Sequence, residues 1–275
     1  MDRTMTRRIC TGAVALSLLA GGGVLAGCGS SSSGSDTAAS TAAADAATQV
    51  PNGVEKLPAK EILAASLAAS KAASSVTVKG VAAEGEEPAT RLDLEVGTDA
   101  GQGTINLGAI TMNIRRVGDR SFYKISAEDF GRIVGAPDNP DDAKALASLL
   151  DDNWINDTGD DGALGSFSEF LQKDEMLASF ISPKGTATVT GTGEVNGIPV
   201  VFLTVTGEDG PGVLAIQTVG EPYPVQLKTK APSAGVIRFT NWNAPVSVTA
   251  PANVIGPEDF EKLAAERGGS GSTSG

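Results

Sequence analysis

Short stretches in which apolar and polar residues alternate recur along most of this chain. In residues 91–96, leucine and valine alternate with charged residues, which is the pattern of a strand with one buried and one solvated face. Turn sequences such as Asn196-Gly197 separate the stretches at the spacing of β-hairpins, and the last stretch covers residues 245–249. About ten strands are expected, and because their connections are short, neighbouring strands should pair antiparallel.

Helical patterns interrupt the strands. The first covers residues 58–74, where a proline suits the first helical position and a thin apolar stripe runs among alanines. A second helix is predicted to begin at Asn139-Pro140, and a third at residues 166–169, whose Ser-Phe-Ser-Glu sequence is typical of a capping box. A short last helix is predicted over residues 257–266. The predicted fold class is therefore α+β, an antiparallel sheet packed on an N-terminal helix and two mid-chain helices.

Residues 25–28 have the sequence Leu-Ala-Gly-Cys, which is typical of the site where a bacterial signal peptide is removed and the new N-terminal cysteine is lipidated. Small residues precede the cleaved bond, and the thiol of Cys28 is the group that is alkylated. A basic start and an apolar stretch over residues 13–25 complete the pattern, and this stretch is too short to span a bilayer. The alternative is a cysteine that follows an ordinary secretory signal by chance.

The composition divides the chain into segments. Residues 1–27 are expected to be the signal peptide, and residues 28–57 the lipidated cysteine with a flexible tether rich in serine and alanine. Residues 58–256 should form the folded domain, which is long enough to bury a core. Residues 257–275 are expected to hold the short helix and a disordered tail.

The sequence has no histidine, and its only cysteines are Cys10 and Cys28. Cys10 lies in the expected signal peptide and Cys28 would carry lipid, so the mature domain should have no free thiol, imidazole or disulfide. Catalysis by Ser-His or Cys-His pairs, thiol redox chemistry and the usual zinc sites are excluded by that composition. We therefore expect a protein that is not an enzyme and that needs no cofactor.

The net charge is −12, and removal of an arginine-rich signal peptide would make the chain more acidic. Such a charge argues against binding of nucleic acid and against attachment to anionic lipid headgroups by a basic patch. Membrane attachment is therefore expected through the N-terminal acyl chains, at the outer face of the cytoplasmic membrane.

Two motifs resemble chemical sites but have simpler explanations. Ser121 and Lys124 have the spacing of a serine–lysine pair, but residues three apart in a strand lie on opposite faces. The acidic stretch over residues 138–161 resembles a calcium loop, but Gly159 stands where a ligand is needed. No metal site is therefore predicted.

The order of these features resembles the LolA-like lipoprotein carriers, in particular the actinobacterial LppX and LprG type. Local sequences add to the resemblance: Ser75-Val-Thr-Val-Lys-Gly80, Gly103-Thr-Ile105, Val117-Gly-Asp-Arg-Ser-Phe-Tyr123 and Gly220-Glu-Pro-Tyr-Pro224. The resemblance covers roughly residues 58–255. It implies a curved antiparallel half-barrel packed on helices, which encloses an apolar pocket for acyl chains, and it brings no catalytic residues.

A binding site for lipid or a lipidated glycoconjugate is predicted between sheet and helices. The residues expected to line it are apolar and lie on two strands and the third helix: Leu92, Leu94, Ile110, Met112, Ile114, Phe167, Phe170, Leu171 and Leu177. The helical residues would close over the strands as a lid, although the same periodicity suits a helix that simply covers a solid core. The alternative function is a non-catalytic interaction or sensing module that docks a protein partner in the cell envelope.

Overall fold

The computed structural model describes residues 50–82, 89–135, 137, 139–156, 164–181, 185–207, 210–229, 234–260 and 262. The predicted signal peptide, Cys28, most of the tether and the C-terminal tail lie outside the described residues. So does the part of the acidic stretch over residues 157–163.

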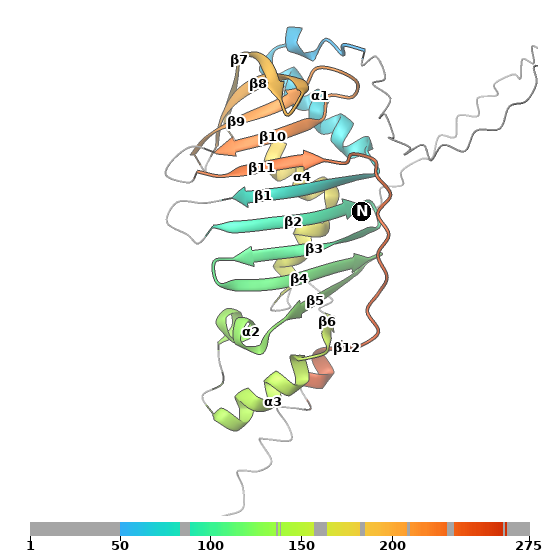
Figure 1. Cartoon of the computed structure of the whole chain (residues 1–275), viewed down its shortest axis with the longest axis vertical. Coiled ribbons are helices and arrows are strands. Elements are labelled where there is room, and N and C mark those ends of the chain that lie inside the picture. The colour runs from blue at the N-terminus through green and yellow to red at the C-terminus, as the bar shows by residue number, and fades with distance from the viewer. Residues whose placement is uncertain are drawn as a thin grey trace, which may run out of the picture. The chain divides into compact units, whose positions relative to one another are not determined.

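One sheet of twelve strands forms the centre of the domain (Figure 1). In sheet order the strands are β12 (Val254–Ile255), β6 (Trp154–Asn156), β5 (Arg120–Ile125), β4 (Ile110–Val117), β3 (Ala100–Leu107), β2 (Thr90–Gly97), β1 (Ser75–Ala82), β11 (Val236–Thr240), β10 (Pro224–Thr229), β9 (Gly210–Gln217), β8 (Ile198–Gly207) and β7 (Thr186–Val195). Every neighbouring pair is antiparallel except β12 and β6, which are parallel. The sheet is open and curved, so the predicted fold class is confirmed.

Tight turns connect the strands where the sequence places them. Leu107 pairs with Ile110, so Gly108 and Ala109 alone make the turn from β3 to β4. At the turn from β7 to β8, Asn196 has a φ of 52° and Gly197 a φ of 81°. These positive values are what a two-residue hairpin requires and what an Asn-Gly pair accepts.

Among the described residues, six helical segments lie before the strands and between them. They are the 3₁₀ helix η1 (Val54–Lys56), α1 (Ala59–Ala72), α2 (Ala127–Val134), α3 (Pro140–Leu150), the 3₁₀ helix η2 (Gly165–Leu171) and α4 (Lys173–Ile181). The predictions of α1 and α3 are confirmed, and the Asn139 side chain caps α3 by accepting a hydrogen bond from the amide of Asp141 at 2.9 Å. The capping box predicted at Ser166 is wrong, because residues 165–171 form η2 and the α-helix begins only at Lys173.

Four elements were not predicted from the sequence. The 3₁₀ helix η1 lies within residues 28–57, which were predicted as a flexible tether, yet its Val54 is buried in the core. Helix α2 is capped by Ser126, whose hydroxyl accepts from the amide of Asp129 at 3.1 Å. Strand β6 is only three residues long, and β12 pairs with it after a long extended connection. Residues 245–249, predicted as a strand, belong to that connection and are not in the sheet. Residues 257–260 are helical as predicted.

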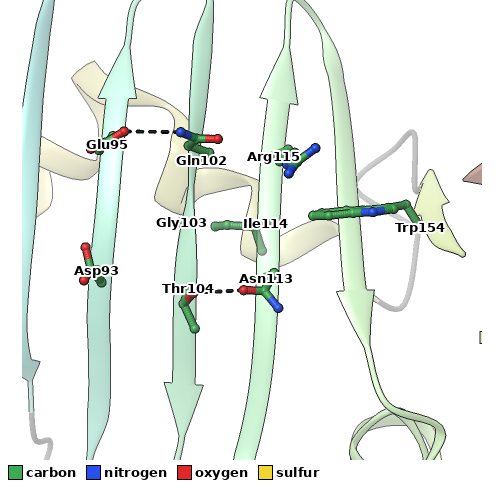
Figure 2. Close-up of a pocket in the computed structure, with 9 residues that line it drawn as sticks. All are labelled: Asp93, Glu95, Gln102, Gly103, Thr104, Asn113, Ile114, Arg115 and Trp154. Atoms are coloured by element: carbon green, nitrogen blue, oxygen red, sulfur yellow. Dashed lines mark hydrogen bonds between the residues drawn. The ribbon is translucent and has the colours of Figure 1, made fainter. Parts of the chain in front are cut away.

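The two faces of the sheet differ. On the inner face, the apolar side chains of β1 to β5 and of β8 to β11 form one hydrophobic core with α1, η2 and α4. On the outer face, the intervening side chains of β2, β3 and β4 are polar, as Figure 2 shows for Asp93, Thr104 and Asn113. Among the described residues, no helix is both long and apolar enough to cross a membrane.

Replacing Gly103 with alanine should destabilise the sheet. A Cβ at this position would overlap the carbonyl oxygen of Asp93 and lie 2.8 Å from the Cα of Leu94. These are backbone atoms of a paired strand, so they cannot move aside. We expect a loss of about 2–4 kcal/mol in the free energy of unfolding, measured by urea denaturation. Gly118→Ala is the comparison, because nothing lies within 4 Å of its added Cβ and only its φ of 59° costs the alanine about 1–2 kcal/mol. A loss at Gly103 no greater than the loss at Gly118 would contradict the steric explanation.

Candidate functional site

The predicted strand residues of the site share the inner face of the sheet. Leu92 on β2 lies opposite Ile105 on β3, which in turn lies opposite Met112 on β4. In the next row, Leu94 and Ile114 flank Gly103 in the same way. Leu92, Leu94, Met112 and Ile114 are buried and Ile110 is half-buried.

The predicted lid residues lie on η2 and α4, which we call the helical cover (residues 165–181). Leu171 and Leu177 are buried, and Phe167 and Phe170 are half-buried against the same core. Leu171 packs above Gly101 of β3, where an added Cβ would lie 3.2 Å from the leucine Cδ2. The structure therefore brings the two predicted sets of residues together, while the opening of a ligand pocket between them stays a prediction.

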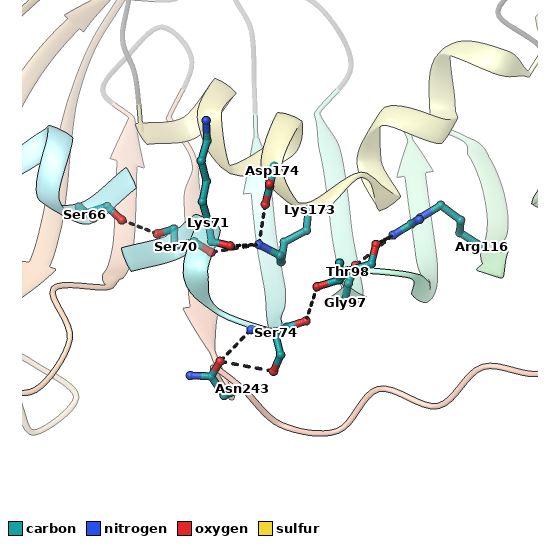
Figure 3. Close-up of polar contacts among 10 residues, drawn as sticks. All are labelled: Ser66, Ser70, Lys71, Ser74, Gly97, Thr98, Arg116, Lys173, Asp174 and Asn243. Atoms are coloured by element: carbon teal, nitrogen blue, oxygen red, sulfur yellow. Dashed lines mark hydrogen bonds and ion pairs between the residues drawn. The ribbon is translucent and has the colours of Figure 1, made fainter. Parts of the chain in front are cut away.

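Arg116 fastens η2 to the end of the sheet. It continues the inner-face positions of β4, and its Nε donates to the carbonyl oxygen of Leu171, the last residue of η2, at 2.9 Å. Its Nη2 donates to the carbonyl oxygens of Gly97 and Thr98 at 3.0 and 2.8 Å (Figure 3). Burial lowers the pKa of Arg116, and this effect exceeds the opposing influence of Asp99 and Asp119.

Lys173 fastens α4 to α1. Its side chain is only 4% exposed, and its Nζ donates to the carbonyl oxygens of Ser70 and Lys71 at 3.1 Å each, and also to Asp174 (Figure 3). The two carbonyls belong to the last turn of α1, where no intrahelical donor reaches them and where a positive charge is favoured. We call Arg116 and Lys173 together the cation latch, since both hold the helical cover through main-chain oxygens.

A cavity of about 230 Å³ lies beside the cation latch. Its lining is polar and charged: Lys71, Thr98, Arg116, Gln172, Lys173, Asp174 and Glu175. Such a lining does not suit an acyl chain. The residues predicted for the lipid site lie instead between the inner face of the sheet and the helical cover.

The two motifs set aside in the sequence have the following positions. Ser121 is buried on the inner face of β5, and Lys124 lies on the outer face opposite Asn113, which confirms that they cannot act as a pair. Among the described residues, no group of three or more Asp or Glu side chains could hold a metal ion.

Sequence reasoning missed both members of the cation latch. Arg116 carried a signal, because it is a charged residue at a position where the alternation of β4 requires an inward side chain. Lys173 carried none, since a lysine at the start of an amphipathic helix ordinarily lies in solvent.

No protein family and no curated protein matches this sequence. Several solved structures are similar to the chain. LprF from Mycobacterium bovis is 17% identical, with a TM-score of 0.47 over 71% of this chain and 97% of that one. Lipoprotein LppX from Mycobacterium tuberculosis is 17% identical, with a TM-score of 0.40 over 69% of this chain and 99% of that one. A LolA superfamily protein from Nitrosomonas europaea is 11% identical, with a TM-score of 0.26 over 70% and 96%. The solved structures to which the chain is similar thus include LprF, LppX and a LolA superfamily protein.

Proposed function

We propose that this protein is a cell-envelope lipoprotein that binds or carries lipid, or a lipidated glycoconjugate, between the inner face of its sheet and the helical cover. Residues 1–27 would be removed as a signal peptide, Cys28 would carry the acyl chains, and the part of residues 28–57 that precedes η1 would tether the domain formed mainly by residues 58–256. The protein would act at the outer face of the cytoplasmic membrane and without catalysis.

One observation carries the proposal of a lipid site. The inner face is apolar over β2, β3 and β4, and the part of η2 that lies over these strands contributes Phe167, Phe170 and Leu171. The cover is fastened where η2 meets α4, through the polar contacts of Arg116 and Lys173. A cover with this arrangement could separate from the sheet and expose an apolar surface on both sides, which is what an acyl chain needs.

The direct test is to extract the protein, purified from its native membrane, with organic solvent and to identify what is released by mass spectrometry. The acyl groups on Cys28 are covalent and stay with the protein, so a non-covalent lipid is distinguishable from the anchor. Lipid at a ratio near one to one supports carriage. A protein from which no lipid is released contradicts it.

Replacing Met112 with tryptophan tests where such a lipid sits. Met112 is fully buried between Ile105 and Ile125 on the inner face. If acyl chains occupy this region, the larger side chain should displace the lipid while the free energy of unfolding changes by less than about 1 kcal/mol. In a solid core the same change should cost about 1–3 kcal/mol. Thr111→Trp adds the same side chain to the exposed face of β4 and should affect neither quantity.

The alternative function, a docking module for an envelope protein, is favoured by the close packing of the interface, where Leu94, Met112 and Leu177 are each 0% exposed. For that function the domain should purify without lipid, Met112→Trp should be strongly destabilising, and one envelope protein should be recovered with the full-length chain after cross-linking. Recovery of lipid would exclude a purely docking role.

A further inference from the structure

The outer face of the sheet carries a second pocket, which is independent of the helical cover. Side chains alternate along a strand, so Asp93 and Glu95 of β2 point away from the face that holds Leu92 and Leu94. The pocket has a volume of about 340 Å³, and its lining from β2, β3, β4 and β6 includes the side chains of Glu95, Gln102, Thr104, Asn113, Arg115 and Trp154 (Figure 2).

An aromatic wall closes one side of this pocket. Trp154 on β6 is half-buried, and the guanidinium of Arg115 lies 4.5 Å from the centre of its ring. Arg115 is itself fixed by a hydrogen bond to the carbonyl oxygen of Thr249 at 3.4 Å. Figure 2 shows the indole edge-on, with Arg115 to one side of the ring plane and Asn113 to the other. The orientation of the Trp154 ring is therefore stabilised by its contact with the Arg115 guanidinium.

The rest of the pocket presents paired polar side chains. Gln102 donates to Glu95 at 3.3 Å, and the hydroxyl of Thr104 donates to the amide oxygen of Asn113 at 2.9 Å. These contacts orient the four side chains. Among the described residues, the second carboxylate oxygen of Glu95 is then left to accept a hydrogen bond, and the amide nitrogen of Asn113 is left to donate one.

The charges of the pocket are largely balanced. Asp93 forms an ion pair with Lys79 at 2.9 Å, and Arg115 stands across β3 from Glu95. A free cation would therefore gain little binding energy in this pocket, because the carboxylates of Asp93 and Glu95 already face positively charged side chains. An acyl chain is disfavoured by the polar lining.

From these features we propose that the outer-face pocket binds the ring of a sugar, as part of a glycan chain that lies across the sheet. The apolar face of a pyranose, lined by C–H groups, would pack on the indole of Trp154. Its hydroxyls would exchange hydrogen bonds with Glu95, Asn113 and Thr104, each of which offers the donor or acceptor that a hydroxyl needs. The volume lies within the range of small-ligand sites, about 300–1,000 Å³, and the shallow position on a sheet leaves room for sugars on either side.

The fluorescence of Trp154 measures this binding directly. The chain has two tryptophans, and the second, Trp242, stacks on Tyr223 with ring centres 4.3 Å apart. Trp242→Phe keeps an aromatic ring in that stack and leaves Trp154 as the only indole. The full-length protein in a detergent without sugar headgroups would be titrated with trisaccharides of glucose, mannose, galactose and N-acetylglucosamine. We expect a saturable change in Trp154 emission for at least one of them, with a Kd in the range of about 10 μM to 1 mM.

Matched variants locate the site. Asn113→Ala removes an amide of β4 that lines the pocket. Asn106→Ala removes a half-buried amide of β3 that lies on the same outer face of the sheet, outside the pocket lining, and likewise accepts a hydrogen bond from a threonine, Thr111, at 2.8 Å. We expect the Kd to rise at least tenfold for Asn113→Ala and to change less than twofold for Asn106→Ala. Trp154→Ala, followed by calorimetry, should abolish binding. Failure of every trisaccharide to bind, or binding that survives both Trp154→Ala and Asn113→Ala, would overturn the proposal.

The sugar could belong to a free polysaccharide or to the head of a glycolipid, and a second titration separates these sources. The trisaccharide that binds would be presented on a lipid in phosphatidylcholine vesicles. Equal dependence on Trp154 in both forms indicates that the pocket recognises the glycan alone. Vesicle binding that Trp154→Ala leaves intact would show that the lipid portion is bound elsewhere, and would overturn a glycolipid as the ligand of this pocket. Loss of lipid from the inner face by Met112→Trp leaves the outer-face result unchanged, so the two proposals fail separately.

Discussion

Replacing Cys28 with serine is expected to abolish lipidation of the protein and cleavage of its signal peptide. The anchor requires a thiol, because sulfur is the atom that receives the diacylglyceryl group, and a serine hydroxyl is not alkylated in its place. Without that step the signal peptide should also remain uncleaved. Each methylene of an acyl chain contributes about 0.8 kcal/mol of membrane affinity, so the loss of two or more chains removes the whole acyl contribution to anchoring.

Phase partitioning in detergent and the mass of the intact protein measure this result. Cys10→Ser is the matched control, since Cys10 is the only other cysteine and lies within the predicted signal peptide, where its thiol has no expected role. The Cys10→Ser protein should be processed and lipidated like the parent. A Cys28→Ser protein that still partitions into the detergent phase with its signal peptide removed would show that the interpretation of residues 25–28 is wrong.

The strands of the meander were predictable because the relevant pattern is local. Residues 90–97 and 110–117 each alternate apolar inward and mostly polar outward positions, and burial of one face fixes that alternation independently of the rest of the chain. The same alternation placed Leu92, Leu94, Met112 and Ile114 on one face, which the structure confirms.

The parts that were not predictable depend on contacts distant in sequence. Strands β6 and β12 are three and two residues long, too short to show a period, and they pair only because the extended segment after β11 carries the chain along the sheet. The capping box at Ser166 failed for a related reason. The carbonyl oxygen of Leu171 accepts a hydrogen bond from the Arg116 side chain. The helix η2 ends at Leu171, and α4 begins at Lys173. Periodicity also cannot distinguish a cover over a pocket from a cover over a solid core.

Replacing Lys173 with methionine is expected to lower the free energy of unfolding by about 2–3 kcal/mol. Methionine keeps most of the buried aliphatic stem, so the packing changes little, but the carbonyl oxygens of Ser70 and Lys71 lose their donor. Hydrogen bonds from a charged group are worth about 1.5–3 kcal/mol each, and the cation also loses its favourable position at the end of α1. Part of this loss is offset, because the ammonium no longer has to be buried.

Lys71→Met provides the control for the lost charge. Lys71 lies in the same turn of α1 with an exposed side chain, so its replacement should change the free energy of unfolding by less than about 0.5 kcal/mol. Urea denaturation measures both variants, and hydrogen exchange locates the effect. In Lys173→Met the amides of α4 should exchange faster than in the parent, and those of β2 and β4 should not, because the start of α4 would be released from α1 while the sheet stays paired. If the cover is the lid of a lipid site, the same variant should also exchange bound lipid faster than the parent. Equal stability of Lys173→Met and Lys71→Met would show that the buried lysine does not hold α4 to α1.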